Sequence, residues 1–220
     1  MTHPDGRPVS LGLFDPTCTR CSRLADALAQ VRVEYLGYHA RPVAPFGDEA
    51  ARLLVVGLAP GLHGANRTGR PFTGDHAGLL LYRTLHRFGF ASRAESTSAD
   101  DGLRLIGCRI TNAVKCWPPA NKPLPAEVCT CNRYLRAELA GLAAGTIVLA
   151  LGAIAHAAVL RAVDLPTRAC AFSHGARHGL PGGRTLHDSY HCSRYNTQTK
   201  RLTDAMFEDV VGRIATELGA

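Results

Sequence analysis

Four apolar runs, each followed by a helical pattern, constrain the fold of this chain more than any other feature. The runs are residues 52–58 (RLLVVGL), 105–114 (LIGCRITNAV), 146–152 (TIVLALG) and, more weakly, 184–191 (RTLHDSYH). The first and third are almost continuously apolar, as expected of parallel strands that are covered on both faces. Helical patterns cover residues 76–89, 125–140, 153–162 and 203–217, and a fifth helix is expected between Cys18 and Val31. Strand then helix, repeated four times, predicts a three-layer α/β/α sandwich with a parallel sheet.

The length and composition limit how many domains the chain can form. The 220 residues are expected to form a single domain, 1–220, whose first 50 residues are an extension ahead of the sheet. No apolar run reaches the length of a membrane span, and the N-terminus lacks the charged-then-apolar pattern of a signal peptide, so we expect a cytoplasmic protein. A formal charge of +7 favours a polyanionic partner, although many basic proteins bind none.

Ligands of parallel sheets collect where the strands end and the loops begin. That rule selects three long polar loops, residues 57–75, 115–123 and 191–201. The first loop lacks both the phosphate-binding lysine motif and the G-x-G-x-x-G spacing, so no nucleotide cofactor is expected. Its single acid, Asp75, either caps the following helix or has a functional role at a ligand site. Phe72 offers an aromatic face on which a planar ligand can stack.

The cysteine spacing is more specific. Cys18 and Cys21 form a C-x-x-C, and Cys116 and Cys131 follow far downstream. In a cytosolic chain such cysteines indicate metal binding or redox chemistry, and four thiolates can bind Zn²⁺ or an iron–sulfur cluster. The second C-x-x-C of the usual zinc pattern is absent, because Cys129 and Cys131 form a C-x-C. Free structural thiols are the alternative.

The last loop begins with a histidine and is rich in basic residues. His191 ends the fourth run, where it is either a structural residue or a catalytic one. Arg194 and Lys200 either contact phosphates or form a solvated basic rim. The other histidines of this region, His174 and His178 among them, are expected to be structural or to face solvent.

With these residues in view, the chain resembles the bacterial family 5 uracil-DNA glycosylases, which are related to the iron–sulfur glycosylases of family 4. The likeness is carried by GLAPG with NRTGRPFTGD, by ITNAVKCWPPANKP, by SYHCSRYNTQTKRLT and by the cysteine pattern, and it covers about residues 15–212. It implies a four-stranded parallel sheet between helices. It also implies a structural [4Fe–4S] cluster that is held by Cys18, Cys21, Cys116 and Cys131.

The resemblance further implies a DNA repair enzyme that flips uracil, and other deaminated or modified bases, out of DNA and hydrolyses the N-glycosidic bond. Phe72 would stack on the base, Gly57 and Ala59 would border it, and Asn112 or Asn121 would read its edge. His191 would stabilise the departing base anion. Related families place a polar residue where this chain has Ala59 and Pro60, which implies that Asp75 positions or activates the water, or stabilises the cationic sugar.

The resemblance also implies how the chain meets DNA. Arg67, Arg70, Arg194 and Lys200 are the expected DNA contacts of a monomeric, nucleoid-associated enzyme. No lysine in the pocket motifs is placed to form a Schiff base, so no lyase activity is expected. Two other readings stay open: an iron–sulfur redox protein, and a zinc-stabilised nucleic-acid-binding module that binds uracil-containing duplex but releases no base.

Overall fold

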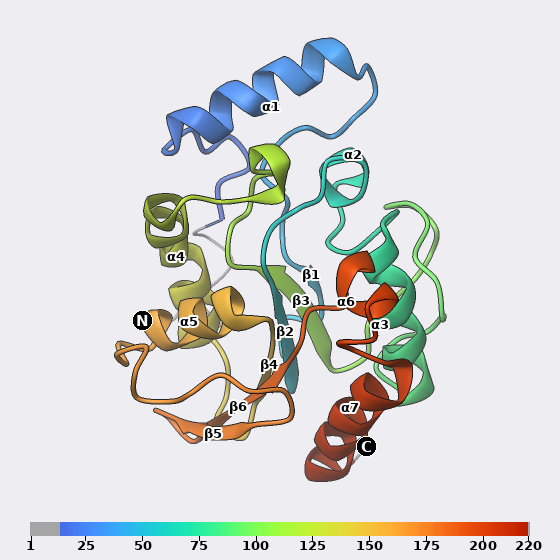
Figure 1. The fold of residues 1–220 in the computed structure, drawn as a ribbon, viewed down its shortest axis with the longest axis vertical. Helices are drawn as coiled ribbons and strands as arrows, with labels where there is room; N and C mark the ends of the chain where they lie inside the picture. Colours follow the sequence, from blue (N-terminus) through green and yellow to red (C-terminus); the bar gives the residue numbers. More distant parts are fainter. Residues whose placement is uncertain (1–13, 220) are drawn as a thin grey trace, which may run out of the picture.

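The computed structural model describes residues 14–219, which form one mixed sheet between two layers of helices (Figure 1). The six strands follow the order β1-β3-β2-β4-β6-β5. The four central strands are parallel: β2 (Leu53–Gly57), β3 (Cys108–Asn112), β4 (Ile147–Leu151) and β6 (Arg184–Ser189). They are the four apolar runs, so the predicted parallel sheet and its α/β class are confirmed. The predicted single domain also includes residues 1–13 and 220, which lie outside the described residues.

Two short strands extend the parallel sheet beyond the predicted four. β1 (Phe46–Gly47) pairs antiparallel with β3, and β5 (Arg177–Leu180) pairs antiparallel with β6. Both are edge strands that bury few side chains, and β5 reads Arg-His-Gly-Leu. Apolar periodicity therefore gives no signal for either one.

The helices cover both faces of the sheet, as the three-layer prediction requires. α3 (His76–Arg87) and α7 (Asp204–Leu218) pack on the face that carries Leu53 and Val55. α1 (Ser22–Glu34), α4 (Pro125–Ala140) and α5 (Ala153–Ala162) pack on the face that carries Leu54 and Val56. Alternate residues of one strand thus enter two separate cores, which is why the strands are apolar throughout. Within residues 14–219, no helix combines the length and apolar character that crossing a bilayer requires.

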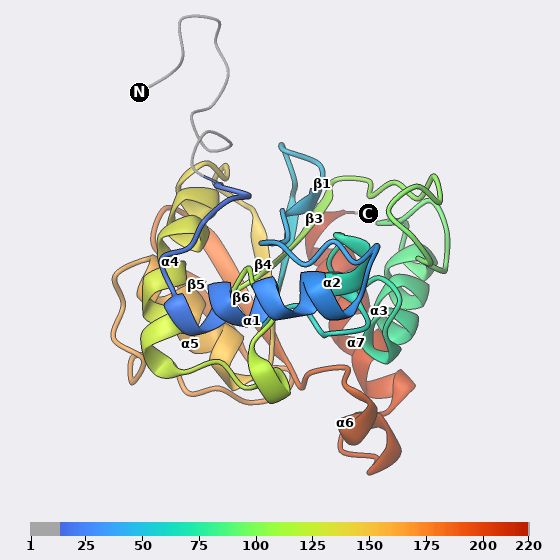
Figure 2. The ribbon, with the colours of Figure 1, turned by 90° about the horizontal axis from the view of Figure 1, so that it is seen from above.

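Three short helical segments lie in the three loops that follow β2, β3 and β6. They are α2 (Ala65–Thr68), the 3₁₀ turn Pro119–Asn121 and α6 (Arg194–Gln198). α6 projects from the body beside α3 and α7 (Figure 2). Because these strands are parallel, all three loops leave the same edge of the sheet and lie close together.

Candidate active site

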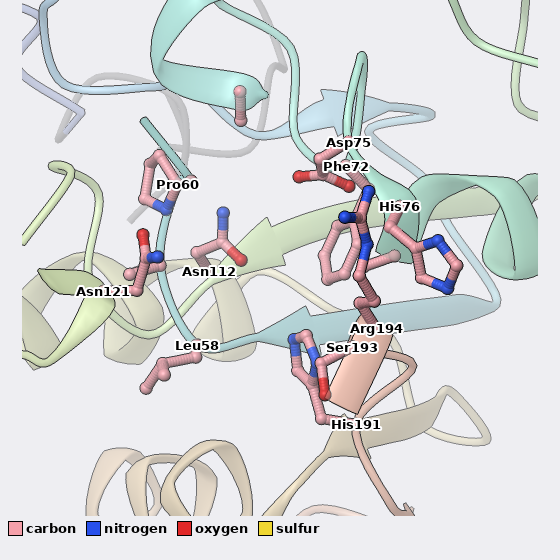
Figure 3. A pocket seen from close by; sticks show the side chains of 14 residues that line it. Leu58, Pro60, Phe72, Asp75, His76, Asn112, Asn121, His191, Ser193 and Arg194 are labelled. Carbon is pink, nitrogen blue, oxygen red and sulfur yellow. The ribbon is translucent and has the colours of Figure 1, made fainter. Parts of the chain in front are cut away.

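A cavity of about 460 Å³ opens at the carboxyl ends of the central strands (Figure 3). Its walls come from the three loops that the strand-end rule selects. Seven of the predicted site residues line it: Ala59, Phe72, Asp75, Asn112, Asn121, His191 and Arg194. Residues from three distant parts of the sequence therefore face one space.

Gly57 does not line the cavity but packs against Phe72 and Asn112, which do. A β-carbon at this position would lie 2.6 Å from Cζ of Phe72 and would also overlap the Asn112 side chain. Phe72 is only 5% exposed and has a positive φ of 54°, a strained conformation for an aromatic residue. The Tyr82 hydroxyl donates to the carbonyl of Pro71 at 2.8 Å and so fixes the chain beside it. Gly57 is thus required for the close packing of Phe72 and Asn112.

Replacing Gly57 with alanine is expected to lower the free energy of unfolding by about 1–3 kcal/mol, because the added methyl group overpacks a buried contact. Urea unfolding measures this change. Gly179→Ala in β5 is the matched control, since a β-carbon there meets no atom within 4 Å. Equal stabilities of the two variants would contradict the close packing at Gly57.

Asp75 both caps α3 and borders the cavity. Its Oδ1 accepts the Gly78 N–H at 3.0 Å, the geometry of an N-cap. A β-carbon at Gly64 would lie 2.5 Å from the other oxygen, so the carboxylate packs directly against that glycine. Burial raises the pKa of Asp75, and the N–H groups of Gly78 and Ala77 oppose that shift. The capping and functional interpretations of Asp75 are therefore compatible.

His191 lies on the opposite wall from Asp75 (Figure 3). It follows β6 directly, and its ring lies 5.9 Å from that of Phe72, centroid to centroid, with the planes 29° apart. Burial lowers the pKa of His191 to about 4, so its imidazole is neutral at pH 7. A neutral imidazole can donate one N–H to a ligand without bringing a positive charge into the cavity.

The two asparagines differ in their environment. Asn112 ends β3, is 3% exposed, and its Oδ1 has no hydrogen-bond partner among the described residues. Asn121 is exposed, and its Oδ1 accepts the indole N–H of Trp117 at 3.2 Å. A buried amide without a partner is costly, and a ligand in the cavity can supply the missing bond. The geometry therefore favours Asn112 as the ligand-reading amide.

The predicted DNA-contacting residues divide into three exposed side chains and one buried one. Arg67, Arg194 and Lys200 are exposed. Arg70 is only 6% exposed, and its guanidinium donates to Asp101 at 2.7 Å, to Ser96 at 3.1 Å and to the carbonyl of Ala99. Arg70 is therefore poorly placed for the predicted DNA contact, because its donors are already engaged within the fold.

The four predicted metal ligands surround a second, small cavity. Cys18, Cys21, Cys116 and Cys131 line it together, from the segment that leads into α1, the loop after β3, and α4. Burial raises the pKa of Cys131 to about 11, and burial together with the neighbouring cysteines raises that of Cys116 to about 12. Grouped buried thiols of this kind need a positively charged centre to ionise, so the residues fit a metal group.

Comparisons with known proteins decide the family. A model of the uracil DNA glycosylase superfamily matches residues 44–215. The type-5 uracil-DNA glycosylase of Thermus thermophilus is 50% identical over 207 residues, which cover 90% of this chain and 94% of the relative. The chain belongs to the type-5 uracil-DNA glycosylases. The type-5 enzyme of Pyrobaculum aerophilum is 42% identical over 206 residues, 92% of this chain and 89% of the relative. A type-4 enzyme of Thermotoga maritima is 34% identical over 110 residues, half of this chain and 49% of the relative.

Sequence reasoning missed three residues near the cavity of this family 5 glycosylase. His76 and Ser193 line it, and Nε2 of His76 lies 2.9 Å from the Thr197 hydroxyl, which joins α3 to α6. Tyr195 is 70% exposed and directly follows Arg194. A capping pattern before α6 was a signal for Ser193, whereas the exposure of Tyr195 becomes visible only in the structure.

Proposed function

We propose that this protein removes uracil from DNA by hydrolysing the N-glycosidic bond and leaves an abasic site. The observation that carries this proposal is the placement of Asp75 and His191 on opposite walls of one cavity, with the Phe72 ring beside His191 in the same cavity. Membership of the type-5 uracil-DNA glycosylases supports the same reaction.

The flipped base enters the cavity at an unstacking cost of a few kcal/mol. Phe72 offers the stacking face, and its strained but tightly packed backbone holds the ring in place. The Asn112 amide reads the edge of the base, because its buried Oδ1 lacks a partner within the described structure. Ala59 keeps the neighbouring wall free of a bulky side chain, and Gly57 leaves room for the side chains of Phe72 and Asn112.

Cleavage of the bond leaves negative charge on the base and positive charge on the sugar. The neutral His191 imidazole donates to uracil O2 and stabilises the base anion as it forms. The Asp75 carboxylate positions or activates the attacking water, or stabilises the cationic sugar. Its pKa is raised by burial, so the reaction requires a pH high enough to ionise it.

The cavity volume of about 460 Å³ leaves room for bases larger than uracil. We therefore extend the proposal to hypoxanthine and to etheno- or hydroxymethyl-substituted pyrimidines. Duplexes that each carry one lesion test it: free base is measured by chromatography, and strands are analysed before and after alkali. Strand breaks only after alkali are expected, because no lysine is among the described residues that line the cavity. Binding without release of any base would favour the non-catalytic binding module instead.

The proposed phosphate contacts are Arg67, Arg194 and Lys200. We propose Tyr195, which is 70% exposed and follows Arg194, as the side chain that enters the gap left by the flipped base. An inserted side chain compensates for lost stacking, which is worth a few kcal/mol per step. Tyr195→Ala is therefore expected to slow excision from duplex DNA about tenfold and to spare single-stranded DNA. Single-turnover rates on the two substrates measure this difference. An equal loss on both would exclude the insertion of Tyr195.

The cysteine site is proposed to hold a structural [4Fe–4S] cluster, bound by Cys18, Cys21, Cys116 and Cys131. Such a cluster would cross-link α1 to α4 and to the loop after β3. Purified protein is expected to be brown, with broad absorbance at about 400 nm and about four irons per chain. Cys131→Ser should lose the iron, whereas Cys129→Ser, an exposed cysteine of the same helix, should retain it. A colourless wild-type protein with stoichiometric zinc would overturn the assignment.

A further inference from the structure

The backbone of His191 is held by hydrogen bonds on both sides. Among the described residues its ring nitrogens form no hydrogen bond, and the ring itself packs against Phe72. On its carboxyl side, the Asn196 amide donates to the His191 carbonyl at 2.8 Å. On its amino side, the Tyr190 N–H donates to Nδ1 of His174 at 3.2 Å. A side chain from the loop before β5 therefore fixes the residue that precedes His191.

The side chain of Tyr190 is held as firmly as its backbone. Its ring stacks on that of His174, with centroids 5.1 Å apart and planes 18° apart. The guanidinium carbon of Arg201 lies 4.7 Å from the same Tyr190 centroid. Arg201 comes from the turn between α6 and α7. The stack of His174, Tyr190 and Arg201 thus joins the two ends of the segment 191–201, which carries His191 and Arg194.

The hydrogen bond from Tyr190 depends on the protonation of His174. Nδ1 accepts only while it has a free lone pair, and the backbone of Met206 in α7 also faces the ring. Burial lowers the pKa of His174, so the ring is neutral at pH 7. The charged groups that face it are Arg213 and Asp209 of α7, together with Arg201 across the Tyr190 ring. Protonation of Nδ1 in acid would turn the acceptor into a donor and break the bond.

We propose that His174 is a positioning residue for His191, because its Nδ1 holds the N–H of Tyr190, the residue that precedes His191. His174 does not line the cavity of the candidate active site. It acts on His191 only through Tyr190, whose N–H it accepts. The inference rests on the proposed glycosylase function, in which His191 must lie at hydrogen-bond distance from the base. A displacement of about 1 Å in such a group can slow catalysis by about a hundredfold.

Two variants of His174 separate the hydrogen bond from simple packing. His174→Asn keeps an acceptor at the place of Nδ1 and does not titrate, whereas His174→Phe keeps a flat ring without an acceptor. His174→Phe is expected to slow single-turnover excision at pH 8 at least about tenfold with unchanged affinity for uracil-containing duplex. His174→Asn should remain within about threefold of the wild type. His86→Asn, on the exposed face of α3, is the matched control.

The pH profile supplies a readout that a merely structural role would not change. The wild-type rate should fall as the pH is lowered through the pKa values of His174 and Asp75, because both groups take up protons there. His174→Asn has no imidazole to protonate, so its excision rate should fall less steeply than the wild-type rate as the pH is lowered. Wild-type rates in His174→Phe, or equal losses in both variants with an unchanged profile, would overturn the inference.

Hydrogen–deuterium exchange of the peptide that contains Tyr190 tests the same bond in DNA-free protein. Exchange should be at least about tenfold faster in His174→Phe than in His174→Asn or the wild type, because the protecting acceptor is lost. Unchanged exchange overturns the role of His174 even if the protein excises no base. Faster exchange in a protein that releases no base would contradict the glycosylase function alone.

Discussion

Replacing Asp75 with asparagine is expected to slow excision of uracil from duplex DNA by about a thousandfold or more, within the range of general acid–base catalysis. The exchange removes the charge and keeps the side-chain oxygen that caps α3, since asparagine is as good an N-cap as aspartate. The loss should therefore appear in the single-turnover rate, while the affinity for DNA and the melting temperature stay close to those of the wild type.

Asp75→Ala separates the two roles of this residue. It should show the same catalytic loss and, in addition, lose about 1 kcal/mol of stability because the Gly78 N–H has no acceptor. The wild-type rate should also fall as the pH drops through the raised pKa of Asp75, because protonation removes the charge. An unchanged single-turnover rate in Asp75→Asn would remove Asp75 from the chemistry.

Replacing His191 with alanine is expected to slow excision by about a hundredfold to a thousandfold, the usual effect of losing one donor to a developing anion. His191→Gln should recover part of the rate, because its amide can still donate. The pKa of His191 is lowered to about 4, so its ring stays neutral and should add no titration between pH 5 and 8.

The control for His191 is a histidine that also borders the cavity but lies at the first turn of α3. His76→Ala removes a bond to Thr197 and should slow excision far less. Equal losses in His76→Ala and His191→Ala would show that His191 has no special role. A His191→Ala enzyme at the wild-type rate would exclude its contact with the base.

The sequence predicts the central sheet well because that information is local. Four apolar runs became β2, β3, β4 and β6, and the predicted helix 125–140 matches α4 residue for residue. The edge strands β1 and β5 escape prediction because pairing with a neighbour, rather than apolar periodicity, makes them strands. The sequence offered capping and a chemical role as alternatives for Asp75, and the structure shows that the residue caps α3 and also lines the cavity.

At the site, the sequence could not show contacts between residues that are distant along the chain. Arg70 lies in a polar loop like that of Arg67, yet its partner Asp101 is 31 residues away. Spacing gives no sign of that pair. Asn112 and Asn121 are equally plausible in sequence, and only the burial of Asn112 separates them. The cysteine spacing predicted a shared site, and the structure groups the four thiols around one cavity.

The most direct test of the central claim is a crystal structure with duplex DNA that carries 2′-fluoro-2′-deoxyuridine, a uracil nucleotide that resists cleavage. We expect the uracil ring on Phe72, a ring nitrogen of His191 within hydrogen-bond distance of O2, and the Asp75 carboxylate beside the anomeric carbon. A uracil that stays stacked in the duplex, or one that lies in the cavity with Asp75 remote from its sugar, would contradict the proposed mechanism.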